Sequence, residues 1–389
     1  MNIVSKELFQ YMVRIRRQIH KHPELGYKEE NTAAIITEEL KKLGIKATAG
    51  IAKTGVVGRI DTTKNTGPVV ALRADMDAIA IQEETGLEFA SEVKGVMHAC
   101  GHDGHVAMLI GAAAILKQSL KAGSVILVFQ PAEEGEGGAQ KIMKSGLLKD
   151  AKAIYACHLD KHFKVGQLVV QKGTISAFTD RFEISIKGRG GHVAQPHETV
   201  DAIVVASLIV MSLQTIVSRE VNPLYPSIVS IGQIEGGTVP NAVAENAWLC
   251  GTIRTTQEVV RKQIIAGIKR IVNAAGRLHN ADIKVDIIKG YPAVTNTCNE
   301  SEIARTAVKN IIGGEALVDA QFASMGGEDF SFYLEKIPGC LVRLGAQKEG
   351  FANIPAHSST FDFDENALGV GAAFLAEAAK LTLDHLEKP

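Results

Sequence analysis

Residues 98–116 have the sequence HACGHDGH followed by VAMLIGAAAIL, and this stretch decides the class of fold. Its first part gathers a thiol, three imidazoles and a carboxylate between small residues that permit a tight turn. Its second part is apolar and rich in alanine, which predicts a buried helix. Upstream, residues 69–72 predict a buried strand that runs into Asp75 and Asp77. We therefore expect the polar cluster on a loop that enters a helix, at the rim of a parallel sheet, where open α/β folds place their chemistry.

The sequence on both sides of this stretch alternates between strand-like and helical segments. Further strands are predicted over residues 55–60, 125–129 and 153–156. The alternation is typical of a helix-covered, mostly parallel sheet. The same character returns near the end of the chain, with a helix over 301–311, a strand over 340–344 and a last helix from Glu365. The fold class is therefore predicted to be α/β, with the sheet domain built from two chain segments.

Between these two segments the pattern changes to β-α-β-β-α-β, the order of a ferredoxin-like α+β unit. Its strands are predicted over 182–186, 227–234, 248–254 and 283–288, and its helices over 199–218 and 257–275. We expect residues 1–174 and 290–389 to form the sheet domain and residues 175–289 to form an inserted domain. The length of 389 residues agrees, because one hydrophobic core seldom grows that large.

Composition excludes several classes of protein. The 42 basic and 43 acidic residues balance, which argues against nucleic acid or an anionic membrane as a partner. Apolar runs such as 106–116 are too short to cross a bilayer, and residues 1–17 lack the apolar core of a secretory signal. The five cysteines are odd in number and scattered, which favours reduced thiols. We expect a cytoplasmic protein.

A second polar element follows the predicted strand 125–129, in the sequence VILVFQPAEEG. Adjacent residues at a strand end point in different directions, so Glu133 and Glu134 can have different tasks. One carboxylate can bind a metal while the other acts as general base on a water molecule. Two adjacent glutamates are more often a solvated acidic turn. Here they follow an apolar strand beside a Cys/His cluster, which favours the chemical role.

Two further histidines follow apolar segments near the same expected rim of the sheet. His158 ends the run Ile154-Tyr-Ala-Cys157, and His357 lies on a loop before the last helix. A lone histidine at a strand end is usually a core residue, but two at one rim indicate metal ligands. Cysteine and histidine suit zinc and similar metals. His98 and His105 are left open, since either could cap, orient a ligand or bind metal.

Several motifs, in order, resemble one family. They are ALRADMDA, HACGHDGH, FQPAEEG, GRGGHVAQPH, GTIRT, MGGEDFSFY and AHSSTFDFDE. The chain is similar over nearly its whole length to the metallo-amidohydrolases that include aminoacylases, hippurate hydrolases, N-acetyldiaminopimelate deacetylases and auxin-conjugate hydrolases. These belong to the metallopeptidases with two co-catalytic metals. The resemblance implies that the inserted domain serves dimerisation and acts as a lid.

The resemblance also assigns roles to individual residues. Five match the family's metal ligands: Cys100, His102, Glu134, His158 and His357. Glu133 matches the general base, and Asp75 matches a carboxylate that orients a ligand. Three residues of the inserted domain match groups that bind the scissile carbonyl and the substrate carboxylate: His192, Asn241 and Arg254. Two divalent ions per subunit are implied, with zinc, manganese, cobalt and nickel all open.

The sequence departs from the family pattern at three positions. Leu159-Asp-Lys-His follows His158 where proline is common, Asn241-Ala-Val-Ala replaces Asn-Val-Ile-Pro, and Ala80 replaces a proline. No departure removes a ligand, so the chemistry is kept while substrate preference stays open. We expect hydrolysis of an N-acyl-L-amino acid, with a dipeptidase, a carboxypeptidase or an N-acetyldiaminopimelate deacetylase as alternatives of the same chemistry.

Two alternatives of other classes are a structural metal protein and an enzyme with Cys100 as nucleophile. Structural zinc sites are usually closed and rich in cysteine, whereas one cysteine, several histidines and a glutamate are involved here. Chelation would inactivate a metallo-hydrolase but not a cysteine nucleophile. We further expect a homodimer in which His192 of each chain serves the active site of its partner.

Overall fold

The computed structural model describes residues 3–62, 67–320, 322–350 and 354–387, and these form two compact units. Unit 1 consists of residues 1–173, 295–321 and 329–389, and unit 2 of residues 174–294 and 322–328. The expected boundaries lay at 174/175 and 289/290. Thr174, residues 290–294 and the short segment 322–328 group with unit 2, whereas the sequence analysis assigned them to the sheet domain.

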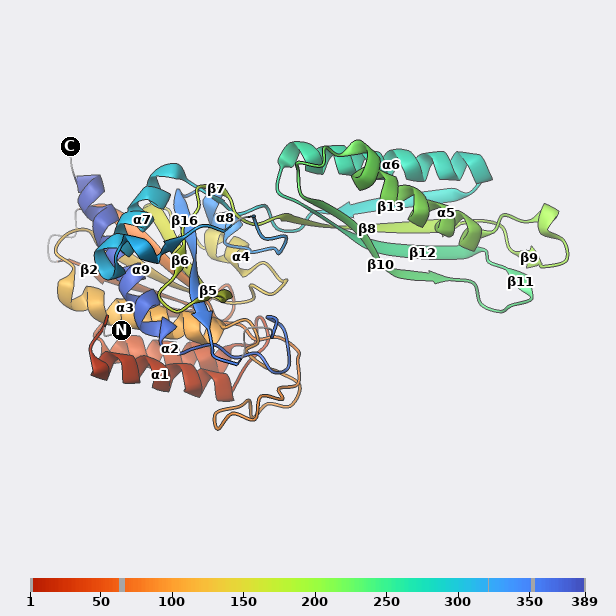
Figure 1. Ribbon diagram of the computed structural model, residues 1–389. Helices are drawn as coiled ribbons and strands as arrows, with labels where there is room; N and C mark the ends of the chain where they lie inside the picture. The colour runs from red at the N-terminus through yellow and green to blue at the C-terminus, as the bar shows by residue number, and fades with distance from the viewer. Residues whose placement is uncertain (1–2, 63–66, 321, 351–353, 388–389) are drawn as a thin grey trace. The chain divides into compact units, whose positions relative to one another are not determined.

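Unit 1 is built on an eight-stranded sheet (Figure 1). Its strand order is β1 (Lys46–Ile51), β2 (Gly55–Asp61), β4 (Ser124–Gln130), β3 (Val69–Asp75), β5 (Ala151–Lys164), β16 (Gly339–Gln347), β6 (Leu168–Val169) and β15 (Leu317–Val318). The central strands β4, β3, β5 and β16 are parallel. Every position of β3 and β4 is buried, as expected for strands covered on both faces. The predicted α/β class with a mostly parallel sheet is confirmed.

The helices of unit 1 are α1 (Lys6–Lys21), α2 (Glu30–Lys42), α3 (His102–Ser119), α4 (Gly138–Lys144), α7 (Cys298–Ile312), α8 (Ser331–Leu334) and α9 (Ala367–Glu387). The alanine-rich α3 is buried along most of its length and packs against α9 and β3. It begins at His102, so the second half of HACGHDGH is helical, whereas we expected the whole cluster on a loop. Gly101, with φ +92°, makes the left-handed turn that precedes the helix.

Unit 2 has the predicted β-α-β-β-α-β order: β8 (Phe178–Lys187), α5 (Ala202–Thr215), β10 (Ser227–Gly236), β12 (Asn246–Thr255), α6 (Glu258–His279) and β13 (Asp282–Ile288). The strands form an antiparallel sheet in the order β10-β12-β8-β13, which is the ferredoxin-like arrangement. In β12 alternate residues are buried, so one face of the sheet carries α5 and α6 and the other stays open (Figure 1).

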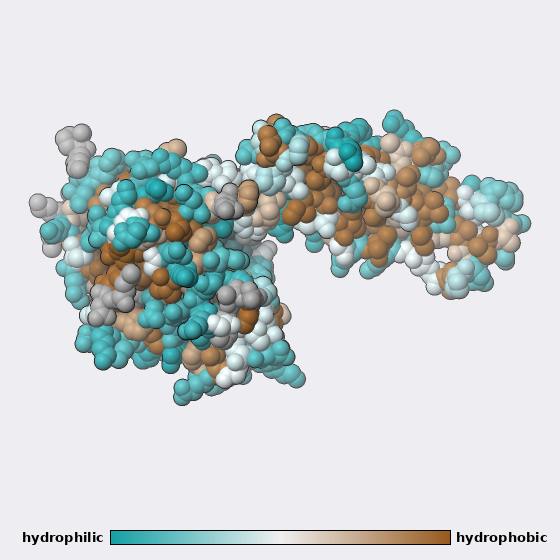
Figure 2. Space-filling model, viewed as in Figure 1, coloured by the Kyte–Doolittle hydropathy of each residue, from teal (hydrophilic) through white to brown (hydrophobic). Residues whose placement is uncertain are grey.

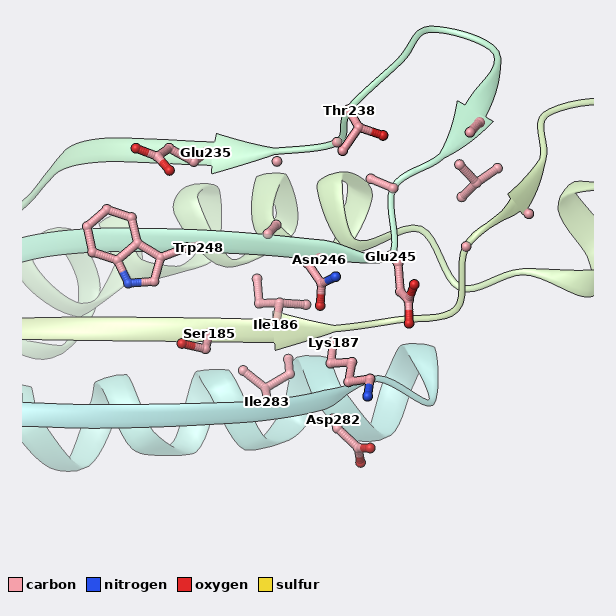
Figure 3. A pocket seen from close by; sticks show the side chains of 18 of the residues that line it. Ser185, Ile186, Lys187, Glu235, Thr238, Glu245, Asn246, Trp248, Asp282 and Ile283 are labelled. Carbon is pink, nitrogen blue, oxygen red and sulfur yellow. The ribbon is translucent and has the colours of Figure 1, made fainter.

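A small two-stranded antiparallel ribbon extends from this sheet. It consists of β9 (Gly191–His192) paired with β11 (Ala242–Val243), which are separated in the chain by α5 and β10. A pocket of about 1050 Å³ lies where the ribbon joins the sheet, and Trp248 and Lys187 are among its lining residues (Figure 3). None of the predicted catalytic, substrate-binding or metal-binding residues lines this pocket.

One stretch of unit 2, Ala202–Glu220, is long and apolar enough by composition to cross a membrane. It comprises α5 and one wider turn, Ile216–Glu220. A single such helix is weak evidence for a membrane protein, because core helices share its length and composition. One side of α5, which includes Val205 and Ile209, is buried in the core of unit 2. The stretch is therefore explained as the helix that covers this sheet.

Candidate metal centre

Strand register brings Asp75 and the predicted ligand His158 to one level of the sheet. Asp75 pairs with Gln130 at the ends of β3 and β4, and Arg73 pairs with Ala156 in β5. His158, two residues further along β5, therefore lies level with Asp75. We expected His158 at a strand end, but β5 continues to Lys164. β4 ends at Gln130, and Glu133 and Glu134 follow after Pro131 and Ala132, of which Ala132 has the left-handed conformation at φ +55°.

The sulfur and nitrogen donors form a close group. Cys100 Sγ lies 3.7 Å from His158 Nε2. Donor atoms of Cys100, His102 and His158 all lie within 4.8 Å of one another. The His158 Nδ1–H donates to the carbonyl oxygen of Leu159 at 2.8 Å. A carbonyl oxygen only accepts, so Nδ1 carries the hydrogen and Nε2 faces Cys100 as a potential ligand.

A second group shares Cys100 with the first. Donor atoms of Cys100, Glu134 and His357 also lie within 4.8 Å of one another. Glu134 Oε1 is 3.1 Å from His357 Nε2 and 3.9 Å from His102 Nε2. The side chain of His357 is half-exposed. Its backbone has φ +63°, a conformation that residues other than glycine rarely adopt. The structure thus brings together all five residues that were expected as ligands.

Asp77 orients His102, a contact that sequence reasoning missed. The Nδ1–H of His102 donates to the Asp77 carbonyl oxygen at 2.9 Å, and Asp77 Oδ1 lies 3.2 Å away. Asp77 Oδ2 accepts the backbone N–H of Glu134 at 3.0 Å. Asp77 lies two residues beyond Asp75, where β3 ends. Asp75 lies 3.8 Å from His102 Nε2.

Asp75 makes its shortest contact with His105. Asp75 Oδ1 lies 2.5 Å from His105 Nδ1, and the backbone N–H of Leu159 donates to His105 Nε2 at 3.0 Å. Both ring nitrogens of His105 are therefore used, and this side chain braces the segment next to His158. His98 is buried, and neither ring nitrogen has a hydrogen-bond partner among the described residues. Burial lowers the pKa of His98 to about 3, so its ring is neutral.

The charges of the group favour a cation. Burial opposes ionisation of the Cys100 thiol, but the nearby charge of His102 and the hydrogen bond with His158 lower its pKa to about 6. Hydrogen bonds to Cys100 and Glu134 raise the pKa of His357 to about 10. His102 Nε2 is buried without a hydrogen-bond partner in the described part of the chain. A thiolate, a carboxylate and an orphaned buried nitrogen fit divalent metals of zinc type.

Glu133 lies beside this donor set and is buried. One oxygen each of Glu133 and Glu134 and one nitrogen of His102 lie within 4.8 Å of one another. Glu133 Oε1 accepts the backbone N–H of Asp329 at 3.4 Å. The two adjacent glutamates therefore have different partners, since Glu134 approaches His357 while Glu133 meets a backbone donor.

The other three predicted residues belong to unit 2. His192 and Asn241 lie on the exposed two-stranded ribbon, where the N–H of Val193 donates to the Asn241 carbonyl oxygen at 3.4 Å. His192 Nδ1 accepts the N–H of Ala194 at 3.1 Å, so a neutral ring carries its hydrogen on Nε2. Arg254 lies near the far end of β12, opposite Thr179, and partial burial lowers its pKa.

Comparison with known proteins places this geometry in a family. The model of "Peptidase family M20/M25/M40" matches residues 71–381. This chain belongs to the M20/M25/M40 peptidase family. An Arabidopsis thaliana protein, IAA-amino acid hydrolase ILR1-like 2, is 40% identical over 96% of this chain and 86% of its own length. Thermostable carboxypeptidase 1 of Saccharolobus solfataricus is also 40% identical, over 94% of each chain.

A solved structure shares the whole fold of this M20 chain. The Bacillus subtilis YxeP protein, described as a dinuclear metal-binding peptidase of the M20 family, superposes with a TM-score of 0.86. It is 35% identical, and the match covers 98% of this chain and 99% of that one. The protein is therefore a metal-dependent hydrolase of amide bonds. This excludes a purely structural metal protein and a metal-independent cysteine nucleophile.

Proposed function

We propose that this M20 enzyme hydrolyses N-acyl-L-amino acids into a carboxylic acid and a free amino acid. The observation that carries the proposal is the buried Glu133 beside a Cys/His/Glu donor set, because it provides a base next to a cation site. The alternatives are a dipeptidase or carboxypeptidase, supported by the carboxypeptidase relative, and an N-acetyldiaminopimelate deacetylase. All of them share the same bond chemistry and differ in the pocket for the acyl group.

The five ligands are proposed to be Cys100, His102, Glu134, His158 and His357, for two divalent ions chosen from zinc, manganese, cobalt and nickel. When bound, such ions polarise the acyl carbonyl and lower the pKa of water. Glu133 accepts a proton from the attacking water and passes it to the leaving amine. Asp77 keeps the hydrogen of His102 on Nδ1, so that Nε2 faces the cation site.

Unit 2 is proposed to bind the substrate's polar groups. Arg254 pairs with the α-carboxylate, for which a planar fork of donors is suited. His192, with its hydrogen on Nε2, donates to the oxygen of the tetrahedral intermediate, which is worth about 3–4 kcal/mol for donors of this kind. Asn241 lies beside His192 on the two-stranded ribbon and binds the scissile carbonyl.

Distances within unit 2 support action across a dimer. Asn246 begins β12, just after the ribbon strand β11. Arg254 lies eight residues further along the same extended strand. At about 3.3 Å per residue they are separated by about 26 Å, far more than a small N-acyl amino acid spans. We therefore assign His192 and Arg254 of one chain to two different active sites. The second site belongs to another subunit.

The surface of unit 2 supports this assembly. Strand β10 is an edge of the sheet, and unpaired edges attract further strands unless they are covered. On the outer side of α5, Val204 is 52% and Met211 70% exposed. Apolar side chains gather on this unit (Figure 2). A twofold pairing covers both features at once.

All described cysteines are free thiols, which supports the cytoplasm as the location.

A substrate and metal screen tests the proposal. The purified enzyme is stripped with a chelator and reconstituted separately with manganese, zinc, cobalt or nickel. N-acetyl, N-benzoyl and longer N-acyl amino acids are compared with dipeptides. We expect that chelation abolishes activity, that one of the metals restores it, and that N-acyl amino acids give the highest kcat/KM. A higher kcat/KM for dipeptides would assign the enzyme to the peptidase alternative.

A further inference from the structure

Asp329 is fully buried in unit 1, and sequence reasoning gave it no role. It belongs to the segment MGGEDFSFY, residues 325–333. Its carboxylate accepts hydrogen bonds from Arg73 Nη2 at 2.9 Å, Gln130 Nε2 at 2.8 Å and the Ala139 backbone N–H at 3.0 Å. These partners come from β3, β4 and the start of α4, so Asp329 is held by three separate segments.

Arg73 and Gln130 are themselves held in place. Arg73 Nε donates to Gln130 Oε1 at 2.9 Å, and Arg73 Nη1 donates to Asp75 Oδ2 at 2.6 Å. The Tyr333 hydroxyl donates to the same Gln130 oxygen at 3.0 Å. A guanidinium presents its donors in a rigid planar fork, so one side chain fixes three acceptors in a common geometry.

The two ends of this network lie at the proposed catalytic centre. At one end the backbone N–H of Asp329 donates to Glu133 Oε1 at 3.4 Å. At the other end Asp75 contacts His105, which accepts the N–H of Leu159 beside the ligand His158. The buried network therefore joins the proposed general base to the strand that carries a metal ligand. Networks of this kind are stiff when every member is satisfied.

We infer that Asp329, held by Arg73 and Gln130, is a positioning residue that keeps the Glu133 carboxylate in place for proton transfer. The inference rests on the proposed role of Glu133 as general base. The carboxylate side chain of Asp329 fixes its own backbone, and its backbone N–H holds Glu133. A displacement of about 1 Å at a reacting group can cost 10²-fold in rate.

A double-mutant cycle tests the inference with Asp329→Asn, Glu133→Gln and the double variant. An amide at position 329 offers fewer acceptor sites to the donors of Arg73, Gln130 and Ala139. We expect Asp329→Asn to lower kcat by about 10–100-fold. KM should stay within about threefold and metal content should be unchanged. In the Glu133→Gln background the same substitution should change kcat by less than about twofold, because coupled residues are not additive.

The outcomes separate the inference from the proposed function. If Glu133→Gln keeps full activity, the proposed role of Glu133 fails. If Glu133→Gln is impaired but Asp329→Asn lowers kcat equally in both backgrounds, only the positioning role is overturned. Loss of metal from Asp329→Asn also overturns it, because the residue would then act on the ligands.

Two further variants guard against a simple loss of folding. Tyr333→Phe removes one hydroxyl from the network. In the parent chain it should lower kcat by several-fold, and in the Glu133→Gln variant it should leave kcat unchanged. An unchanged kcat with Glu133 present would overturn the inference even if Asp329→Asn does not fold. Glu39→Gln is the matched control, because Glu39 is a buried carboxylate held by Tyr11 and Arg14 in α1. It should lower the melting temperature and leave kcat unchanged.

Discussion

The two units hold their functional residues in opposite ways. In unit 1 the proposed ligands and the general base gather beside a buried sheet, and buried Asp77 holds two of the ligands, His102 and Glu134. In unit 2, His192 and Asn241 lie on an exposed two-stranded ribbon beside Asn246, and Asn246 is about 26 Å from Arg254 along β12. Unit 1 therefore holds its proposed centre in a preorganised form. The proposed roles of the unit 2 residues require a second surface.

The largest expected effect on activity comes from substitutions at the adjacent glutamates of unit 1, Glu133 and Glu134. Glu133→Gln should retain its metals and lose about 10²–10⁴-fold in kcat, the amount typical of a general base. Glu134→Gln should instead lose metal, because it removes a carboxylate ligand. Metal analysis and kinetics on both purified variants distinguish the two roles. Equal metal content in the two variants would contradict the division of labour.

The next largest effect tests whether His192 of unit 2 acts at the active site of another chain. His192→Ala should lose about 10²–10³-fold in kcat, as for the removal of one oxyanion donor. Mixing this variant with Glu133→Gln should restore activity, because half of the sites in a heterodimer then combine an intact base with an intact histidine. Subunit exchange is verified by native mass spectrometry. Exchange without recovery would show that His192 acts within its own chain.

A smaller effect is expected where a partner of a ligand is changed. Asp77→Asn weakens the acceptor that holds the Nδ1–H of His102, so metal affinity should fall about 10–100-fold. Competition with a chromophoric chelator measures this affinity. Asp286→Asn, an exposed carboxylate of unit 2, is the control and should bind metal like the parent chain. An unchanged affinity in Asp77→Asn would remove Asp77 from the centre.

The smallest effect concerns the thiol. In the metal-free protein, His102 and His158 lower the pKa of Cys100 to about 6, against an ordinary thiol value near 8.5. The thiolate forms as pH rises, so the rate of Cys100 alkylation should be half-maximal near pH 6 and level off about one pH unit above it. Bound metal should protect it. Mass spectrometry after iodoacetamide treatment measures this, with the exposed Cys298 as internal control. Equal labelling with and without metal would exclude Cys100 as a ligand.

Local sequence patterns were enough to predict the architecture. The apolar run after HACGHDGH gave α3, the alternation in 55–156 indicated the parallel sheet, and the change of pattern near residue 175 indicated the inserted unit. The residue types of the proposed ligands were also visible, because few side chains bind metals. These features depend on periodicity and chemistry within short segments, and both are recorded in the sequence itself.

Contacts between distant segments could not be predicted in this way. The family resemblance assigned an orienting carboxylate to Asp75 and nothing to Asp77, whereas in the fold Asp77 meets His102 and Asp75 meets His105. Nothing near Asp329 in the sequence indicated its contact with Glu133. The placement of His192 and Arg254 toward opposite ends of β12 also required the observed strand pairing. The sequence by itself determined which side chains are available, and tertiary structure decided which of them meet, because side-chain partners depend on register and packing across the whole fold.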